Sequence, residues 1–583
     1  TQRIDNYLGG VSRQSDDKKK PGQVRECLNA YPDPTFGLTK RPGIKWITNL
    51  ATGTTHDNSK WFYIHRDADE KYVGCITPAS VAVTTNGTGS GTAGTYTNKA
   101  IASTSGTGTG MTVDVVIAGG VATKITINAV GTGYSNGDTI TIAKANVGNT
   151  TADVVGTITL GDVDIWNATS GTACTITYGT DAREYLTGTR SNYDILTVQD
   201  TSIITNNLTV TDILAAPSFT ANTQGTLALN GLVAASTFDV SIKIGGTTHS
   251  ISTYTAAADA TYDVVLTGLK SAIDGLSISN LSVTKYKTTL KITYTSAFTL
   301  SGRGGAANDK LEVFQDLVAN VSDLPPFSYQ NHVVKIINTA SAESSYFAKF
   351  LADDGVSGPG YWQETIDPAV STGFNAATMP HELVNTGTNT FTFRRVTWNS
   401  RLVGDDTTND HPSFKGNKIQ QTFYHSNRLG FLSNDNVILS RSGEYFNFYN
   451  ISAQVQAESD PVDLRCTTIR PAVLHGVLPT TQGLVLFSKN QQFLMSSNDG
   501  ILTPSSTVIK TIANYEMSSD VDPIDMGTNI NFISKTPSYT RVFGMVTRGQ
   551  EENPQILDVG RVVNEWIPST IDTLVGSPQN QFI

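Results

Sequence analysis

The side chains that come nearest to a known chemical motif are those of His381-Glu382-Leu383-Val384. In the zinc-protease motif H-E-x-x-H, two histidines on one helical face bind zinc and the glutamate activates a water molecule. Asn385 occupies the position of the second histidine, so one ligand is absent. Because Pro380 precedes the motif and strand-forming residues surround it, we expect a structural turn here rather than a metal site.

A second candidate cluster consists of Asp405, Asp406, Asp410 and His411, as acid, base and orienting group or as calcium ligands. The sequence lacks the Asp-x-Asp-x-Asp-Gly loop of a calcium site, and clustered acids on a turn are usually solvated. No identifiable nucleophile or base pair accompanies them. The sequence therefore predicts no catalytic residues, no cofactor-binding residues, no metal ligands and no bound cofactor.

Glycines and cysteines add no further chemistry. Gly106, Gly108 and Gly110 are not followed by Gly-Lys-Ser/Thr, and a strand comes next, so we expect a flexible turn and not a phosphate loop. The cysteines are too scattered for a Cys-x-x-Cys site, and a chain of 583 residues needs no disulfide scaffold. We therefore expect free thiols at Cys27, Cys75, Cys174 and Cys466.

Aromatic and basic side chains each allow a binding and a structural interpretation. Tyr361, Trp362 and Trp398 would stack on a sugar in a glycan-binding protein, but aromatics in sheets are more often core or interface anchors. Basic residues near the N-terminus would contact DNA or pair with acidic patches on a neighbouring protein, and they lack the helix or interleaved aromatics of a DNA-binding surface. These residues are Lys18, Lys19, Lys20, Lys40, Arg41 and Lys45.

The composition argues against a protein that binds nucleic acid tightly. The chain carries 41 Lys and Arg against 51 Asp and Glu, and this net charge of −10 does not suit phosphate neutralisation. This charge remains compatible with passing contact with DNA. No apolar run approaches the roughly twenty residues of a membrane-spanning helix, and we expect no signal peptide at Thr1-Gln2-Arg3-Ile4.

The elements that must position these residues are mainly β-strands. Pairs of strand-like runs recur with turns between them, at 61–64 with 71–76, 193–198 with 202–205, 483–488 with 492–495, and 529–534 with 540–546. Their spacing predicts an interrupted β-propeller-like domain, and a plain β-sandwich explains so many strands less well.

Two segments interrupt this series of strand pairs. From 77 to 182, β-branched residues alternate with polar ones between Gly-rich turns, which predicts an inserted all-β module rather than a disordered linker. From 217 to 400 the pattern is mixed. A helix is predicted after Asp259, with an apolar face formed by Tyr262, Val265, Leu266, Leu269, Ile273 and Leu276.

The predicted fold class is mainly β with an α/β section. It comprises an extended N-terminal arm at 1–50, the first propeller-like strands at 51–76 and 183–216, an inserted Gly/Thr-rich all-β module at 77–182, a mixed α/β platform-like domain at 217–400, and a propeller-like β domain at 401–583.

The segment Phe423–Tyr449 carries a resemblance to a known family. With Asp405-Asp406, Asn409–Phe414 and its own end Glu444–Tyr449, it resembles the tail nozzle proteins (tail tubular protein B) of short-tailed, podovirus-type bacteriophages. Further motifs follow the family's order at Gly9–Gln14, Gly37–Gly43, Leu324-Pro325-Pro326, Tyr361–Thr365, Met379–Val384 and Asp460–Asp463. The resemblance covers the beginning and roughly residues 190 to 545, and the module at 77–182 departs from the family.

The resemblance assigns structural rather than catalytic importance to particular positions. For Arg428, at the start of a predicted strand, we favour a fold-stabilising role in which the guanidinium ties together backbone carbonyls or acids. The motif positions are Gly9, Gly10, Lys40, Arg41, Pro42, Pro380, His381, Asn427, Arg428, Leu429, Gly430, Phe431, Tyr445, Phe446, Phe448, Asp460 and Pro461.

The resemblance also implies partners and a location. It implies a homohexameric ring attached to an adaptor (tail tubular protein A) ring, with tail fibres at the junction and an axial channel that stays closed until infection. Phage genomic DNA would pass without sequence-specific binding, and the ring would meet the host envelope. The protein would assemble in the host cytoplasm and reside in the virion. Because relatives continue beyond the position of Ile583, we expect the family's last section to be missing or shortened.

Two rival classes stay open. A tail-associated peptidoglycan or glycan hydrolase would need two carboxylates at a fixed separation across a cleft, and sequence alone gives no such separation. A glycan-binding adhesin is supported only by the aromatic runs and the Gly/Thr-rich module.

Overall fold

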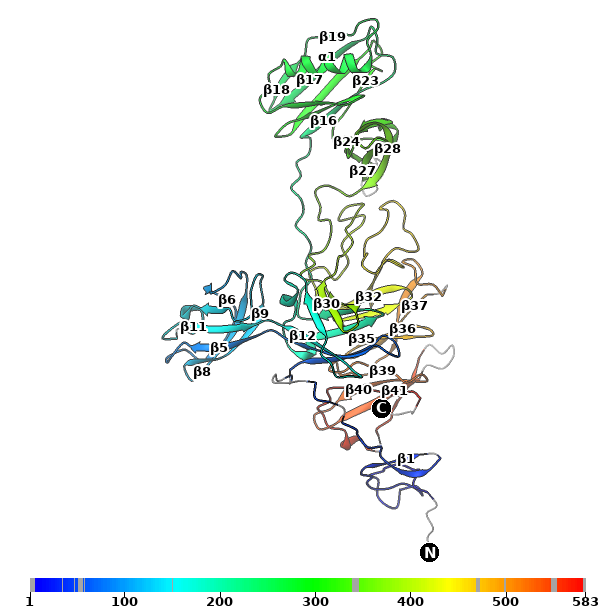
Figure 1. Ribbon diagram of the computed structural model, residues 1–583. Helices are drawn as coiled ribbons and strands as arrows, with labels where there is room; N and C mark the ends of the chain where they lie inside the picture. Colours follow the sequence, from blue (N-terminus) through cyan, green and yellow to red (C-terminus); the bar gives the residue numbers. More distant parts are fainter. Residues whose placement is uncertain are drawn as a thin grey trace.

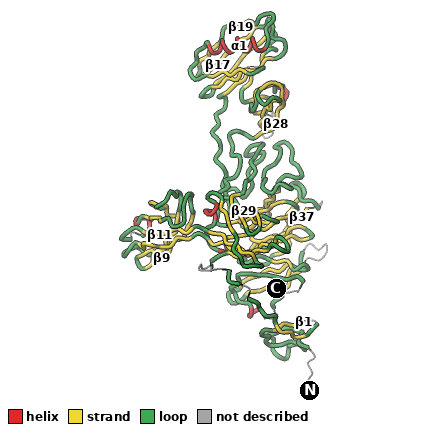
Figure 2. Tube along the Cα trace, in the orientation of Figure 1, coloured by secondary structure: helices red, strands yellow, loops and turns green. Residues whose placement is uncertain are grey.

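The computed structural model confirms a mainly β chain, with a single α-helix among the described residues (Figures 1 and 2). No described helix is long and apolar enough to cross a membrane. Short 3-10 helices lie at Lys144–Asn146, Ala182–Tyr185, Arg190–Asn192, Val321–Asp323 and Asn564–Trp566. The structure describes residues 6–33, 35–46, 48–50, 56, 58–148, 150–337, 345–467, 472–497, 500–546, 553–561, 563–579 and 583.

The N-terminal arm is mostly exposed and contains one hairpin, β1 (Ala30–Asp33) with β2 (Gly37–Lys40). It lies at the end of the molecule that also holds the last described residues (Figure 1). Arg13 contacts the C-terminal part of the chain. Its guanidinium lies 3.7 Å from the Glu565 carboxylate and 5.7 Å from the centre of the Trp566 ring.

Two sheets come from strands that are widely separated in sequence. The first has the order β12-β4-β3, and the second has the order β13-β30-β29-β15-β14. The predicted pairings of 61–64 with 71–76 and of 193–198 with 202–205 are confirmed. The strands are β3 (Lys60–His65), β4 (Lys71–Thr77), β12 (Asp162–Asn167), β13 (Thr175–Tyr178), β14 (Tyr193–Val198), β15 (Thr201–Asn206), β29 (His381–Gly387) and β30 (Thr390–Arg395).

Three further sheets follow one another along the C-terminal part, each with four antiparallel strands in chain order. The first contains β31 (Gln421–His425), β32 (Arg428–Ser433), β33 (Asn436–Leu439) and β34 (Val462–Arg465). The second contains β35 (Leu474–Thr480), β36 (Gly483–Ser488), β37 (Gln492–Ser497) and β38 (Thr507–Ala513). The third contains β39 (Ile524–Asp525), β40 (Ile530–Lys535), β41 (Thr540–Val546) and β42 (Gln555–Asp558).

These five sheets, which we call the central sheets, pack face to face in series. One hydrophobic cluster joins the β12-β4-β3 sheet to the five-stranded sheet, and a second joins the five-stranded sheet to β31–β34. Two more join β31–β34 to β35–β38, and β35–β38 to β39–β42. Within the described chain, the strands at 60–77 share no hydrophobic cluster with those at 421–558.

A seven-stranded sheet forms a separate module beside the central sheets (Figure 1). Its core consists only of residues from 79 to 160. Residues 162–178, which the sequence assigned to the module, instead pair with β4 and β30. The strands, in the order β6-β8-β9-β5-β11-β10-β7, are β5 (Ser80–Asn86), β6 (Gly94–Ala100), β7 (Ser103–Thr104), β8 (Thr112–Ala118), β9 (Val121–Ala129), β10 (Thr139–Ile142) and β11 (Val154–Thr159).

The α/β section lies at the opposite end from the arm (Figure 1). The predicted helix is confirmed as α1 (Tyr262–Asp274), where the Thr261 side chain accepts a hydrogen bond from the Val264 N–H at 3.4 Å. Its buried residues pack into a core with β16 (Gln224–Leu229), β17 (Thr237–Ile244), β20 (Ser282–Lys285), β21 (Thr289–Thr293), β22 (Phe298–Gly304) and β23 (Leu311–Phe314). The strands β18 (Thr247–Ser250) and β19 (Tyr254–Thr255) pair with β17.

A small five-stranded sheet follows the α/β core. Its order is β24-β26-β27-β28-β25, with β24 (Leu317–Val318), β25 (Phe327–Tyr329), β26 (Val333–Ile336), β27 (Tyr346–Ala352) and β28 (Ser357–Thr365). Residues 381–395, which the sequence grouped with this section, return to the central sheets as β29 and β30.

Candidate functional sites

The turn between β31 and β32 is built by Ser426 and Asn427, both in the left-handed region with φ of 49° and 59°. A two-residue turn of this kind matches the twist of the strands that it joins. The Asn427 side-chain oxygen accepts hydrogen bonds from the hydroxyls of Tyr424 at 3.0 Å and Tyr445 at 2.8 Å. The turn therefore positions Arg428, the first residue of β32.

Arg428 is 2% exposed, and its guanidinium donates to five backbone carbonyls. Nη1 contacts the carbonyls of Ser440 and Asp460 at 2.7 Å each, and Nη2 contacts that of Glu458 at 3.0 Å. The other two carbonyls are those of Ser459 and Leu502. Burial lowers the pKa of Arg428. This is the kind of contact that the sequence suggested, and it holds segments 428–440, 458–460 and 502 together.

The structure brings together only some of the motif positions. Phe431, Phe446 and Phe448 lie in or against one core cluster, and any Cβ at Gly430 would meet the Phe423 ring at 2.3 Å. Asp460 is fully buried beside Arg428 and accepts a hydrogen bond from the Ala457 N–H at 2.7 Å. By contrast, Gly9, Gly10, Lys40, Arg41 and Pro42 belong to the exposed arm, and Pro380 and His381 lie at the start of β29.

His381 is the first residue of a strand, so the prediction of a structural turn is wrong. Its ring stacks against Tyr185 at 4.2 Å between centroids, and its Nδ1 donates to the Met379 carbonyl at 2.9 Å. Burial lowers the pKa of His381 to about 3, which keeps the ring neutral. Glu382 pairs with Arg394 at 2.7 Å. Each group is therefore occupied by a structural contact.

The acidic cluster does not converge on a reaction centre. The Asp405 carboxylate caps its own turn by accepting from the Thr407 and Thr408 N–H groups at 2.9 Å each. Asp406 pairs at 2.8 Å with Arg401, whose side chain is fully buried. His411 bonds to the Tyr449 hydroxyl at 2.9 Å, and burial lowers its pKa to about 4.

The remaining candidates are mostly structural. Trp362 donates its ring N–H to the Pro325 carbonyl at 2.8 Å, and Trp398 lies in a core cluster, whereas Tyr361 is 59% exposed. Gly108 is a packed rather than a flexible turn residue, because a Cβ there would meet the Tyr134 ring at 2.3 Å. All four cysteines are free, as predicted. In the arm, Lys19 pairs with Asp16 at 2.7 Å.

A charged group between central sheets was not anticipated from the sequence. The Asp194 carboxylate, on β14, accepts a hydrogen bond from the Thr422 N–H on β31 at 2.6 Å. Burial and repulsion from Asp522 raise the pKa of Asp194 to about 7, while Lys60 on β3 acts in the opposite sense. Burial also raises the pKa of Asp522, which lies near Lys60. Charged side chains from β14, from β3 and from the segment before β39 (Ile524–Asp525) thus lie near one another.

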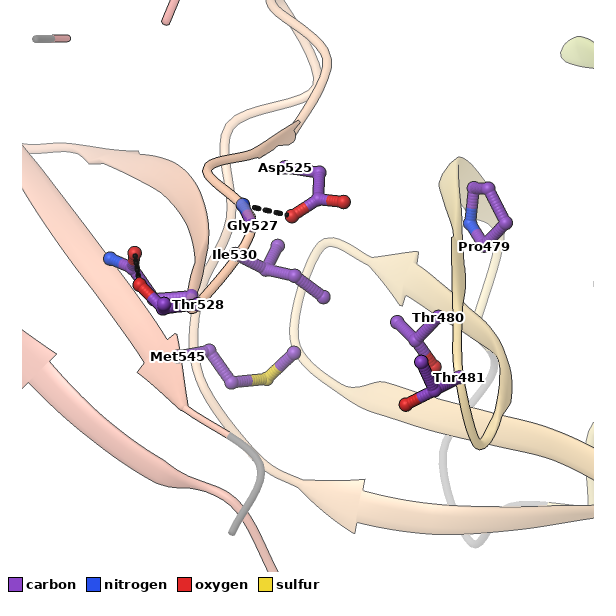
Figure 3. Close-up of a pocket in the computed structure, with 9 residues that line it drawn as sticks. Pro479, Thr480, Thr481, Asp525, Gly527, Thr528, Ile530 and Met545 are labelled. Carbon is purple, nitrogen blue, oxygen red and sulfur yellow. Dashed lines mark hydrogen bonds between the residues drawn. The ribbon is translucent and has the colours of Figure 1, made fainter. Parts of the chain in front are cut away.

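A cavity of about 360 Å³ opens between the β35–β36 turn and the strands β39–β41 (Figure 3). Pro479, Thr480 and Thr481 form one wall, and Asp525 and Met545 lie on the other. The Asp525 carboxylate accepts from the Gly527 N–H at 2.7 Å. Asp525 is the cavity's sole ionisable side chain among the described lining residues, so the lining offers no acid–base pair.

A second unanticipated group consists of His56, Cys75 and Asp164. Burial, followed by repulsion from Asp162, raises the pKa of the Asp164 carboxyl. Burial raises the pKa of the Cys75 thiol to about 12. Their spacing in sequence matches no motif, and no local pattern groups the three residues.

Comparison with known proteins defines the class as a structural protein of a phage tail. The profile of the family described as bacteriophage nozzle protein matches residues 1–118 and 149–583. The chain is also 30% identical over 284 residues to tail tubular protein gp12 of Escherichia phage T7. This alignment covers 48% of the chain and 35% of that relative's length.

The chain belongs to the bacteriophage nozzle protein family, which confirms the resemblance seen in the sequence. The family profile leaves only residues 119–148 unmatched. The departure from the family is therefore narrower than the predicted range of 77–182, and it falls inside the seven-stranded module.

Proposed function

We propose that this chain is a subunit of a ring-shaped tail nozzle that forms and gates the DNA ejection channel at the distal end of a short phage tail. The observation that carries the proposal is the family match, which extends over nearly the whole chain. The relative named above is a tail tubular protein, and a tube requires subunits with extended lateral contacts. A chain of packed sheets with outlying modules suits that requirement.

In this proposal the ring is a homohexamer attached to an adaptor ring, and tail fibres dock near the junction. The net charge of −10 supports a channel wall that lets DNA slide instead of binding it. Gating needs no covalent chemistry: side chains in the lumen block the path until receptor engagement rearranges the ring. The seven-stranded module lies on the outside of the ring.

We further propose that the five central sheets act as the blades of an interrupted β-propeller. Edge strands β3, β14, β31 and β35 lie next to one another in that order, as innermost blade strands would. Lys60 on β3 and Asp522, just before β39, approach each other near Asp194, which supports closure between the first and the last sheet.

Imaging of the purified full chain tests the ring. We expect particles of uniform stoichiometry with an axial opening, and coaxial docking when the adaptor protein is added. A chain that stays monomeric at micromolar concentration, alone and with the adaptor, would contradict the proposal.

The rival hydrolase hypothesis has its own test in a peptidoglycan release assay. We expect no turnover, and we expect His381→Ala, Glu382→Ala, Asp405→Ala and Asp406→Ala to change stability or assembly only. These side chains already serve structural contacts. Turnover that disappears in one variant while that variant still forms rings would favour the hydrolase.

A further inference from the structure

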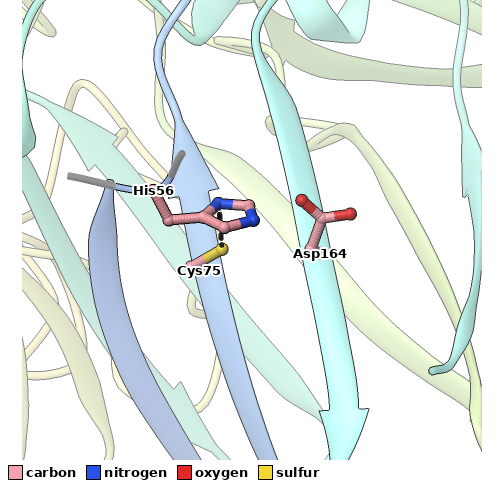
Figure 4. A group of neighbouring side chains, drawn as sticks. All are labelled: His56, Cys75 and Asp164. Atoms are coloured by element: carbon pink, nitrogen blue, oxygen red, sulfur yellow. Dashed lines mark hydrogen bonds between the residues drawn. The ribbon is translucent and has the colours of Figure 1, made fainter. Parts of the chain in front are cut away.

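Three side chains with metal-binding donor atoms meet on one face of the β12-β4-β3 sheet (Figure 4). Cys75 on β4 and Asp164 on β12 are direct partners in the antiparallel register, so their side chains leave the sheet on the same side. His56 lies just before β3, and its ring lies between the thiol and the carboxylate. One donor atom from each residue lies within 4.8 Å of the other two.

Two tryptophans hold the His56 ring in place. Trp61 and Trp166 stack on each other with 5.8 Å between ring centroids. Each also meets the His56 ring edge-on, at 5.8 Å for Trp61 and 6.1 Å for Trp166. These two rings orient the imidazole, as the surroundings of a metal ligand commonly do.

Packing alone does not explain why these polar groups gather here. The opposite face of the same sheet supplies Ile64, Tyr72 and Ile76 to a hydrophobic cluster. Cys75 is nevertheless fully buried, and its sulfur lies 3.5 Å from His56 Nδ1. His56 and Asp164 are half-buried, and the hydroxyl oxygens of Ser59 and Thr77 lie 3.4 Å from His56 Nδ1. The cost of burial therefore falls mainly on the Cys75 thiol, which a bound cation would offset.

The donor set selects the kind of cation. Sulfur and imidazole nitrogen suit zinc and similar transition ions, while calcium and magnesium prefer oxygen ligands. Zinc bonds of about 2.0 to 2.3 Å place tetrahedral ligands roughly 3.3 to 3.8 Å apart. Small side-chain rotations would bring the three donor atoms to that spacing from their present positions.

We propose that His56, Cys75 and Asp164 form a zinc site with water in the fourth position. Binding breaks the S–H bond of Cys75, forms a metal–sulfur bond and releases the proton to solvent. The ion would join the segment before β3 to β4 and β12, and its role would be to stabilise the first central sheet rather than to catalyse a reaction.

Cobalt titration of the chelator-treated full chain tests this proposal, because Co²⁺ reports both geometry and sulfur ligation. We expect one equivalent of Co²⁺ to give the visible bands of a tetrahedral ion and a thiolate-to-cobalt charge-transfer band, and Zn²⁺ to displace it. Zn²⁺ should also raise the unfolding temperature, as expected for a ligand of the native state. A folded protein with no charge-transfer band and no thermal shift would overturn the proposal.

Variants separate this site from adventitious binding. Cys75→Ser should remove the charge-transfer band, and Asp164→Asn should weaken Zn²⁺ binding by more than about 100-fold, beyond the effect of losing a supporting group. Cys174→Ser is the matched control, because Cys174 is half-buried with Asn389 as its side-chain neighbour, and it should bind like the parent. If Cys75→Ser does not fold, Asp164→Asn decides. Unchanged binding in that variant, or a band that persists in Cys75→Ser, contradicts the assignment.

Discussion

The seven-stranded module and the central sheets fill their cores in different ways. The module's core is almost entirely aliphatic, and Tyr134 is its one fully buried aromatic among the described residues. Thr150 is the one buried polar side chain described there. The central sheets instead bury aromatic rings together with charged groups such as Arg401, Arg428 and Asp460.

This difference has consequences for stability. An aliphatic core gains free energy in small increments from each contact, whereas a buried polar group stabilises only when all its partners are present. We therefore expect a destabilising substitution in the module to affect the module alone. Loss of a polar contact in the central sheets should instead destabilise several of those sheets.

The largest effect should come from Arg428→Met. It leaves five carbonyls without their donor, and we expect a loss of about 3 to 5 kcal/mol in the free energy of unfolding of the central sheets. Denaturant unfolding followed by tryptophan fluorescence measures it. Arg465→Met is the control, because that side chain is 75% exposed and makes an ion pair with Asp435, so its loss should cost less than about 1 kcal/mol. Equal losses would refute the distinction.

A cavity in the module should come next in size and should stay within the module. Ile140 is fully buried on β10, and Ile140→Ala should destabilise the module by about 2 to 5 kcal/mol. Hydrogen exchange should accelerate in peptides from 79–160 and remain unchanged in those from 421–513. Faster exchange in both regions would show that the two cores unfold together.

The stability of the central sheets should depend on pH through the buried carboxyl group of Asp194. Its pKa is raised to about 7 in the folded state, so its contribution is fully present below the unfolded value near 4 and is lost as the pH rises through 7. Asp194→Asn should therefore be more stable than the parent at pH 8, by up to about 4 kcal/mol, and similar to it at pH 4. Asp69→Asn, an exposed carboxylate in the β3–β4 turn, controls for the loss of charge. An equal gain at both pH values would argue against titration of Asp194.

The smallest effect on the central sheets should come from removing the module altogether. Ser80 and Thr159 are paired residues on β5 and β11, so a short glycine linker can replace residues 81–158. We expect the free energy of unfolding of the central sheets to change by less than about 0.5 kcal/mol, with rings still formed. Loss of soluble protein would mean that contacts such as the 2.6 Å bond from the Gly133 N–H to Glu184 are essential.

Local patterns predicted much of this fold, and long-range pairing accounts for what they missed. Helix α1 and the hairpins β3–β4 and β14–β15 follow from periodicity within a few residues. The strands β12 and β13 were assigned to the module, because nothing local reveals that they pair with β4 and β30.

The candidate sites show the same limit. The role suggested for Arg428 came from its place at the start of a strand, and its carbonyl partners lie as far along the chain as Leu502. His56, Cys75 and Asp164 could not be grouped from the sequence, since the register of β4 and β12 brings two of them together. His381 was expected in a turn because Pro380 precedes it, but pairing with Arg395 and Ile204 makes it part of a strand.

The pairing of Ser80 with Thr159 also bears on how such proteins diversify. The module leaves and rejoins the chain at neighbouring points, so recombination between those two codons can exchange it without shifting the register of any other sheet. The residues that the family profile does not match, 119–148, fall within this exchangeable unit. Exchange of this unit would therefore change the part of the chain that departs from the family and leave the pairing within the central sheets as it is.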